Sequence, residues 1–85
     1  MARYSLHFKK SVAKDLRAIA KEEVKRILTR VDSLADEPRP PGCEKLKERE
    51  VYRIRQGVYR ILCEIRDDVL LVVVIKVQHR SEVYR

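Results

Sequence analysis

The stretch VYRIRQGVYRILCEIR, residues 51–66, decides the fold of this chain. Apolar and polar side chains alternate along it with the period of two that is typical of β-strands. Near its middle lies Gly57, a residue type that favours tight turns between paired strands. The stretch therefore predicts a β-hairpin whose strands cover residues 51–56 and 58–66.

A two-residue turn at Gln56-Gly57 fixes which side chains share a face of this hairpin. It predicts one apolar face suited to covering by helices, made of Tyr52, Ile54, Tyr59 and Ile61. On the other face it places Arg53 directly opposite Arg60, with Arg55 beside them. Like charges in that arrangement destabilise a hairpin. A three-arginine cluster on an open sheet face is typical of a phosphate site, because guanidinium groups match phosphate oxygens. The alternative is a solvated outer face that keeps the sheet soluble.

Upstream of the hairpin, helical spacing runs from Ser11 to Ala35 with no Gly or Pro between them. Ser11 is expected to cap the first helix. The spacing permits one helix of about 24 residues or a helical hairpin with a break near residues 20–22. We prefer the hairpin, since so small a domain has difficulty burying a rod about 36 Å long. The proline-rich residues 38–42 then end the helical region.

Two further strands complete the expected fold. Residues 4–8 alternate as a short half-buried strand, and residues 69–77 are apolar on both faces, as in a central strand. Residues 43–50 are expected to form a charged connector. The order β-α-α-β-β-β predicts an α+β fold, with two N-terminal helices packed on one face of a mainly antiparallel sheet. The whole chain, residues 1–85, is expected to be a single domain.

The composition narrows the possible partners. The chain has 85 residues, is 45% hydrophobic, and carries 20 Lys and Arg against 13 Asp and Glu, a net charge of +7. The apolar content is sufficient for a folded domain. The excess of positive charge suits binding to nucleic acid, an anionic membrane or an acidic protein. The alternative is that this charge serves only to keep the protein soluble. No apolar run has the length of a membrane span or the character of a signal peptide, so we expect no membrane association and a cytoplasmic location.

Cys43 and Cys63 are the two cysteines of the chain. They do not have the spacing of metal ligands, and we expect neither a metal nor a cofactor. Two reduced thiols are favoured over a bridge in a chain without an export signal, although the sequence leaves a disulfide open.

Several stretches together resemble the RelE/ParE toxin superfamily. They are YRIRQGVYRIL at residues 52–62, IKVQHRSEVYR at 75–85, FKKSV at 8–12, and the helix end from Leu34 to Pro38. The resemblance covers the whole chain. It implies a toxin of a type II toxin–antitoxin pair. RelE-type members cleave mRNA in the ribosomal A site without a metal ion, whereas ParE-type relatives bind DNA gyrase and are not nucleases.

The resemblance also implies which residues act. By position, Arg53, Arg60, Arg80 and Tyr84 match the catalytic set of RelE-type toxins; Arg53 and Arg55 stand where RelE itself has lysines. Arg55, Arg53, Lys47 and His79 are assigned to RNA binding. Cys63 departs from the Tyr often found at its position, and we interpret it as core packing. The expected function is thus a ribosome-dependent, metal-independent endoribonuclease, with a gyrase inhibitor as the alternative.

The chemistry of RNA cleavage is consistent with this set. Attack by the 2′-OH needs a base, an acid for the leaving oxygen, and cations for the phosphorane, which the arginines can supply. Tyrosine has a reference pKa of about 10, but nearby guanidinium groups would lower that of Tyr84. His79 is the rival for the acid–base role, because histidine exchanges protons near neutral pH. The expected partners are a cognate acidic antitoxin, in a hetero-oligomer with the toxin, and the ribosome with its mRNA.

Overall fold

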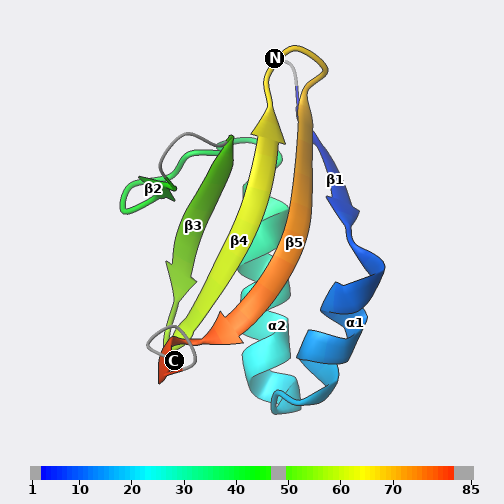
Figure 1. Ribbon diagram of the computed structural model, residues 1–85, viewed down its shortest axis with the longest axis vertical. Coiled ribbons are helices and arrows are strands. Elements are labelled where there is room, and N and C mark those ends of the chain that lie inside the picture. The colour runs from blue at the N-terminus through cyan, green and yellow to red at the C-terminus, as the bar shows by residue number, and fades with distance from the viewer. Residues whose placement is uncertain (1–2, 47–49, 82–85) are drawn as a thin grey trace.

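The sheet has five strands, with two helices packed against one of its faces (Figure 1). This architecture comes from a computed structural model that describes residues 3–46 and 50–81. The elements follow in the order β1 (Ser5–Phe8), α1 (Lys10–Arg17), α2 (Lys21–Ser33), β2 (Glu44–Lys45), β3 (Val51–Gln56), β4 (Tyr59–Arg66) and β5 (Leu71–His79). The strands are arranged β1-β5-β4-β3-β2. Only the β1–β5 pair is parallel among these neighbours, so the predicted α+β class with a mainly antiparallel sheet is confirmed.

The helical region is a hairpin, as preferred from the sequence, with its break at residues 18–20. The predicted cap at Ser11 is wrong, because Ser11 lies inside α1 and Lys9 holds the N-cap position without a side-chain hydrogen bond. The backbone N–H of Lys9 donates to Val74 O at 2.9 Å. The chain therefore remains attached to the sheet through Lys9, and α1 begins at the next residue.

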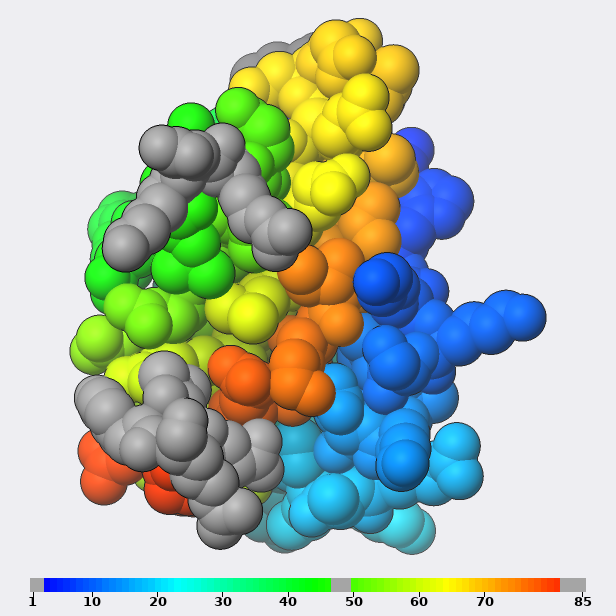
Figure 2. Space-filling model, viewed as in Figure 1, coloured from blue at the N-terminus to red at the C-terminus, as the bar shows by residue number. Residues whose placement is uncertain are grey.

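One hydrophobic core lies between the helices and the sheet. The helices contribute Val12, Ile27, Val31 and Leu34; the sheet contributes Tyr52, Ile54, Ile61, Cys63, Ile65, Val72, Val74 and Val77. Tyr59 packs partly buried against this cluster, so the predicted apolar face of the hairpin is confirmed. In Figure 2, the opposite face of the sheet presents side chains of β3, β4 and β5 without a covering helix.

The predicted pairing within the hairpin is wrong, because each residue of β3 pairs with a residue of β4 two positions further along the chain than predicted. Ile54 faces Ile61, and Arg55, not Arg53, lies opposite Arg60. The turn is Gly57-Val58, and Gly57 has φ +61°. A positive φ at the first central residue but not at the second, Val58, is the pattern of a type II′ turn, which favours Gly at the first position and matches the twist of paired strands. Because the shift is two residues in the partner strand, every side chain keeps its predicted face.

A β-bulge in β5 changes which of its residues face the core. Leu62 pairs with Lys76 while Cys63 pairs with Val74, so Ile75 is the extra residue. Past the bulge, Val77 is buried with Val74 on the helix-covered side. The predicted central position of this strand is confirmed, although it covers Leu71–His79 and not residues 69–77.

The sheet also contains a strand that the sequence analysis missed. Within the expected connector 43–50, Glu44 and Lys45 form the short edge strand β2. Glu44 pairs with Arg53, and Lys45 pairs with Tyr52. This pairing brings a carboxylate to the arginine-bearing face of the hairpin.

Candidate anion-binding site

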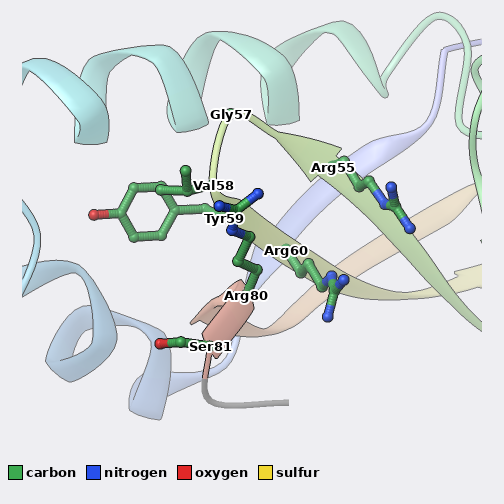
Figure 3. Close-up of a pocket in the computed structure, with 7 residues that line it drawn as sticks. All are labelled: Arg55, Gly57, Val58, Tyr59, Arg60, Arg80 and Ser81. Atoms are coloured by element: carbon green, nitrogen blue, oxygen red, sulfur yellow. The ribbon is translucent and has the colours of Figure 1, made fainter. Parts of the chain in front are cut away.

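Three arginines line one pocket at the end of the sheet where β3 turns into β4. The pocket has a volume of about 430 Å³, and its lining residues are Arg55, Gly57, Val58, Tyr59, Arg60, Arg80 and Ser81 (Figure 3). In this view Arg55 and Arg60 project from neighbouring strands, and Arg80 reaches toward the turn from the segment after β5. The pocket therefore concentrates positive charge contributed by distant parts of the sequence.

Strand pairing and one backbone hydrogen bond position these arginines. Arg55 and Arg60 are Cα partners in the β3–β4 ladder, on the face opposite the core. The N–H of Arg80 donates to Val58 O at 2.8 Å, which fixes the end of β5 beside the Gly57-Val58 turn. The turn thus organises the site, because it sets the register of Arg55 and Arg60 and anchors Arg80.

Arg60 differs from its neighbours in burial. It is only 7% exposed, whereas the side chain of Arg55 is 61% exposed. The open sheet face that was expected for the arginine cluster is found at Arg55, whereas Arg60 is enclosed. An arginine stays charged even when enclosed, and its interactions with an anion are stronger where water is excluded. Arg60 is accordingly the member of the pocket best placed to stabilise developing negative charge.

Arg53 belongs to a different environment on the same face. Its Nη2 lies 2.8 Å from Oε2 of Glu44, and Nη2 of Arg55 lies 3.5 Å from Oε1 of the same carboxylate. Arg53 does not line the pocket of Arg55, Arg60 and Arg80. The structure thus divides the predicted cluster of Arg53, Arg55 and Arg60, with Arg55 contributing to both groups.

Glu44 is the residue of this region that sequence reasoning missed. Between Val51 and Cys63 the sequence has no acidic residue, so the cluster was expected to be purely cationic. No local signal could have found it, because Glu44 and Lys45 are both polar and do not alternate as a half-buried strand does.

His79 lies on the helix-covered side of the sheet, opposite the face that bears Arg55 and Arg60. It pairs with Tyr59, and the two rings meet edge to face with centroids 5.5 Å apart. Its Nδ1 accepts a hydrogen bond from the N–H of Ser81 at 3.1 Å and contacts Ser81 Oγ at 2.8 Å. His79 is not among the residues that line the arginine pocket. Nδ1 is therefore occupied by its contacts with Ser81.

Two of the predicted site residues, Lys47 and Tyr84, lie outside the described residues. Among the residues that are described, no group of three or more His, Cys, Asp or Glu could hold a metal ion. Cys43 and Cys63 are both free thiols. Cys63 is fully buried, as predicted, and burial raises its pKa to about 12. Burial also raises the pKa of Cys43, so neither thiol has the reactivity of a thiolate at neutral pH.

A second charged cluster lies at the opposite end of the sheet. Asp67 accepts a bidentate pair of hydrogen bonds from Arg39, at 2.9 and 3.0 Å, and another from the hydroxyl of Tyr4 at 2.6 Å. The Arg39 guanidinium lies 4.7 Å from the ring centroid of Tyr52. These contacts tie the loop after α2 to the β4–β5 turn, and we assign them to stability. No helix in the described ranges is long and apolar enough to cross a membrane.

Comparison with known structures reveals close relatives of this fold. The archaeal RelE of the RelE–RelB complex from Pyrococcus horikoshii OT3 superposes with a TM-score of 0.80 at 26% identity, over 93% of this chain and 97% of that one. RelE of the RelB–RelE antitoxin–toxin complex from Methanococcus jannaschii gives 0.71 at 28%, over 92% and 94%. The isolated E. coli RelE toxin gives 0.77 at 25%, over 95% and 90%.

The sequence itself matches a family model along nearly all of its length. Residues 6–84 match the model described as ParE toxin of type II toxin-antitoxin system, parDE. No curated protein sequence matches the chain. The family match covers the hairpin, the arginine pocket and the helices alike, and the structural matches are to RelE toxins. The chain therefore belongs to the ParE toxin family, within the RelE/ParE superfamily, and is a toxin of a type II toxin–antitoxin system.

Proposed function

We propose that this toxin is a ribosome-dependent, metal-independent endoribonuclease of the cytoplasm that cleaves mRNA in the ribosomal A site and so inhibits translation. The observation that carries this proposal is the convergence of Arg55, Arg60 and Arg80 on one pocket. Cleavage through the 2′-OH builds negative charge on the phosphorane oxygens, and fixed cations in a partly enclosed site stabilise that charge. Similarity to RelE toxins supports the same reaction class.

The roles follow from position and chemistry. Arg60, the most enclosed arginine of the pocket, stabilises the phosphorane, and Arg80 neutralises the same phosphate from the end of β5. Arg55 and Arg53, on the open face, bind the flanking RNA backbone. Lys47 and His79 are proposed for RNA binding from the resemblance alone, since His79 lies on the other side of the sheet. Tyr84 supplies the acid–base group, with His79 as its rival. No cofactor is required, because the 2′-OH of the substrate is the nucleophile.

The ribosome is proposed to orient the mRNA so that its 2′-OH is in line with the leaving 5′-oxygen. Such orientation contributes several kcal/mol to the lowering of a barrier. We expect purified toxin to cleave A-site mRNA on programmed ribosomes in the presence of EDTA, on complexes stabilised separately against loss of Mg²⁺. Naked RNA should be cleaved poorly. Equal cleavage of free and ribosome-bound RNA contradicts the proposal.

The second candidate is inhibition of DNA gyrase without nuclease activity, which the match to a ParE toxin model favours. Gyrase binding gives no reason for three arginines to share one pocket, which is why it ranks second. Assays of both targets with the same preparation separate the two functions. Accumulation of linear DNA with gyrase and intact mRNA on ribosomes identifies the gyrase inhibitor.

A cognate antitoxin is the proposed protein partner. The solved structures that this toxin resembles include RelE toxins in complex with RelB antitoxins. A toxin with a net charge of +7 is neutralised most effectively by a segment rich in Asp and Glu, with apolar anchors. Expression of the toxin alone should arrest growth, and co-expression with the product of an adjacent acidic reading frame should relieve the arrest.

A further inference from the structure

Glu44 holds two of the arginines that are proposed to bind the RNA backbone. Its Oε2 lies 2.8 Å from Nη2 of Arg53, and its Oε1 lies 3.5 Å from Nη2 of Arg55. A carboxylate presents to a guanidinium group the same kind of charged oxygen acceptors as a phosphate does. Glu44 therefore occupies donors that a backbone phosphate would use.

The location of Glu44 allows it to leave. It lies on the two-residue edge strand β2, and its side chain is 48% exposed. Arg53 is more enclosed, at 22%, and its Nε is buried without a hydrogen-bond partner among the described residues. Exchange of the carboxylate for a phosphate would thus retain the position of Arg53 and disturb no core residue.

Arg55 connects this ion pair to the arginine pocket. It lines the pocket shared with Arg60 and Arg80, and it also lines a second pocket of about 380 Å³ that includes Glu44 and Arg30. An RNA strand whose reacting phosphate lies between Arg60 and Arg80 would therefore meet Glu44 at its next contact along the sheet.

We propose that Glu44 is an internal competitor for RNA phosphate that determines substrate specificity. It lowers the affinity of Arg53 and Arg55 for free RNA, so that these arginines bind a backbone phosphate only when other contacts already hold the strand in place. An mRNA fixed in the ribosome meets this condition, whereas a free strand does not. The inference rests on the proposed function in taking the RNA backbone as the ligand.

The test is binding of a labelled single-stranded oligoribonucleotide by fluorescence anisotropy over a range of salt concentrations. Glu44→Gln and Glu44→Ala should each bind about 2- to 5-fold more tightly than wild type, the size expected on releasing a partly exposed ion pair. Each extra phosphate contact should also make the slope of log affinity against log salt more negative by about 0.7. Thermal melting establishes that each variant is folded.

Asp36→Asn is the matched control. This substitution removes the same charge and also breaks an exposed ion pair, since Asp36 Oδ1 lies 3.0 Å from Arg3 Nε. Asp36 is remote from the arginines of the hairpin, because it follows Ala35, whose carbonyl accepts a hydrogen bond from the N–H of Tyr4 at the other end of the sheet. The proposal is overturned if the Glu44 variants gain no more affinity for the oligoribonucleotide than Asp36→Asn does, or if both Glu44 variants bind it more weakly than wild type. The absence of binding by every variant also overturns it. In an Arg53→Gln background, the effect of Glu44→Gln should fall by at least half.

Cleavage assays on ribosomes with the same variants separate this inference from the proposed function. If wild type cleaves A-site mRNA but Glu44→Gln leaves free-RNA binding at the control level, the inference fails and the function stands. If Glu44→Gln tightens binding of the oligonucleotide and no protein cleaves mRNA on ribosomes, the phosphate competition stands and the nuclease proposal fails. In the expected case, Glu44→Gln also raises cleavage of free RNA relative to cleavage on ribosomes.

Discussion

Arg55 and Arg60 lie directly opposite each other on β3 and β4, with Arg60 enclosed and Arg55 largely exposed. Two like charges at paired positions repel each other, and an anion bound between them reduces this repulsion. Arg80 adds a third positive charge to the same pocket. An anion at this position would therefore stabilise the fold as well as be bound by it.

Arg60→Ala should lower the rate of mRNA cleavage on ribosomes by at least about 10²-fold, because it removes a preorganised cation from the transition state. Ribosome binding should change little, so the loss appears in single-turnover cleavage at saturating toxin. The matched control is Arg66→Ala, which removes an arginine from the far end of the same strand, where it pairs with Glu64 and Asp68. Similar losses in both variants would show that general charge, and not the pocket, matters. Because Arg60 is enclosed, unchanged melting temperatures are required for the comparison.

The acid–base role can be assigned by two substitutions. Tyr84→Phe keeps the ring and removes the hydroxyl, and should lower single-turnover cleavage by about 10²- to 10⁴-fold, within the range of proton-transfer catalysis. His79→Ala should cost less, because His79 packs against Tyr59 on the helix-covered face and does not line the arginine pocket. Wild-type cleavage by Tyr84→Phe together with loss in His79→Ala would transfer the role to the histidine.

The fold was predictable from the sequence because its periodicities are strong. The alternation around Gly57 gave the hairpin, and the burial of Tyr52 and Ile54 follows from it. The exact pairing was not predictable, because the choice between the turns Gln56-Gly57 and Gly57-Val58 depends on the backbone conformation of Gly57. That choice decides whether Arg53 or Arg55 lies opposite Arg60.

The parts of the site that the sequence did not reveal depend on contacts between distant residues. Glu44 reaches Arg53 only because β2 forms, and a two-residue strand has too little periodicity to be recognised. The side of the sheet on which His79 lies depends on the bulge at Ile75, which reverses the alternation of β5. Neither feature has a local sequence signal, since each results from the pairing of the whole sheet.

Asp15 should be important for stability although it is remote from the pocket. Its Oδ2 accepts a hydrogen bond of 3.1 Å from the N–H of Val77. Val77 lies on β5 beyond the residues that pair with β1, so Asp15 provides the acceptor there in place of a strand. Its side chain is 18% exposed and also lies 3.7 Å from Nζ of Lys76. Asp15→Ala leaves this partly buried N–H without its acceptor and should lower the free energy of unfolding by about 1–3 kcal/mol.

Urea denaturation measures this cost, and Asp15→Asn serves as its internal control. The amide oxygen of Asn can still accept the bond from Val77, so Asp15→Asn should lose less than Asp15→Ala. Asp36→Asn, which alters an exposed carboxylate, should have almost no effect. Equal stability of Asp15→Ala and wild type would show that the hydrogen bond makes no net contribution.

The cluster of Asp67, Arg39 and Tyr4 should give stability a defined dependence on pH. Hydrogen bonds from Arg39 and Tyr4 lower the pKa of Asp67, while the bond to Asp67 raises the pKa of Tyr4. A carboxyl group whose pKa is lower in the folded state contributes stability above its unfolded pKa of about 3.9, and that contribution disappears as pH falls through the folded value. For Tyr4 the sign is opposite: its contribution is present below pH of about 10 and is lost as pH rises through its folded pKa.

We therefore expect wild type to exceed Asp67→Asn in stability by a constant amount between about pH 5 and 9, measured by urea denaturation at each pH. The difference should shrink as the solution is acidified below about pH 4, because protonated Asp67 no longer pairs with Arg39. Tyr4→Phe should differ from wild type most near neutral pH, and the difference should shrink in acid as Asp67 is protonated and in alkaline solution as Tyr4 ionises. Because Asp67 is exposed to solvent, added salt should reduce its contribution. A difference between wild type and Asp67→Asn that stays unchanged from neutral pH to pH of about 2 would mean that the pairing with Arg39 and Tyr4 does not stabilise the folded state.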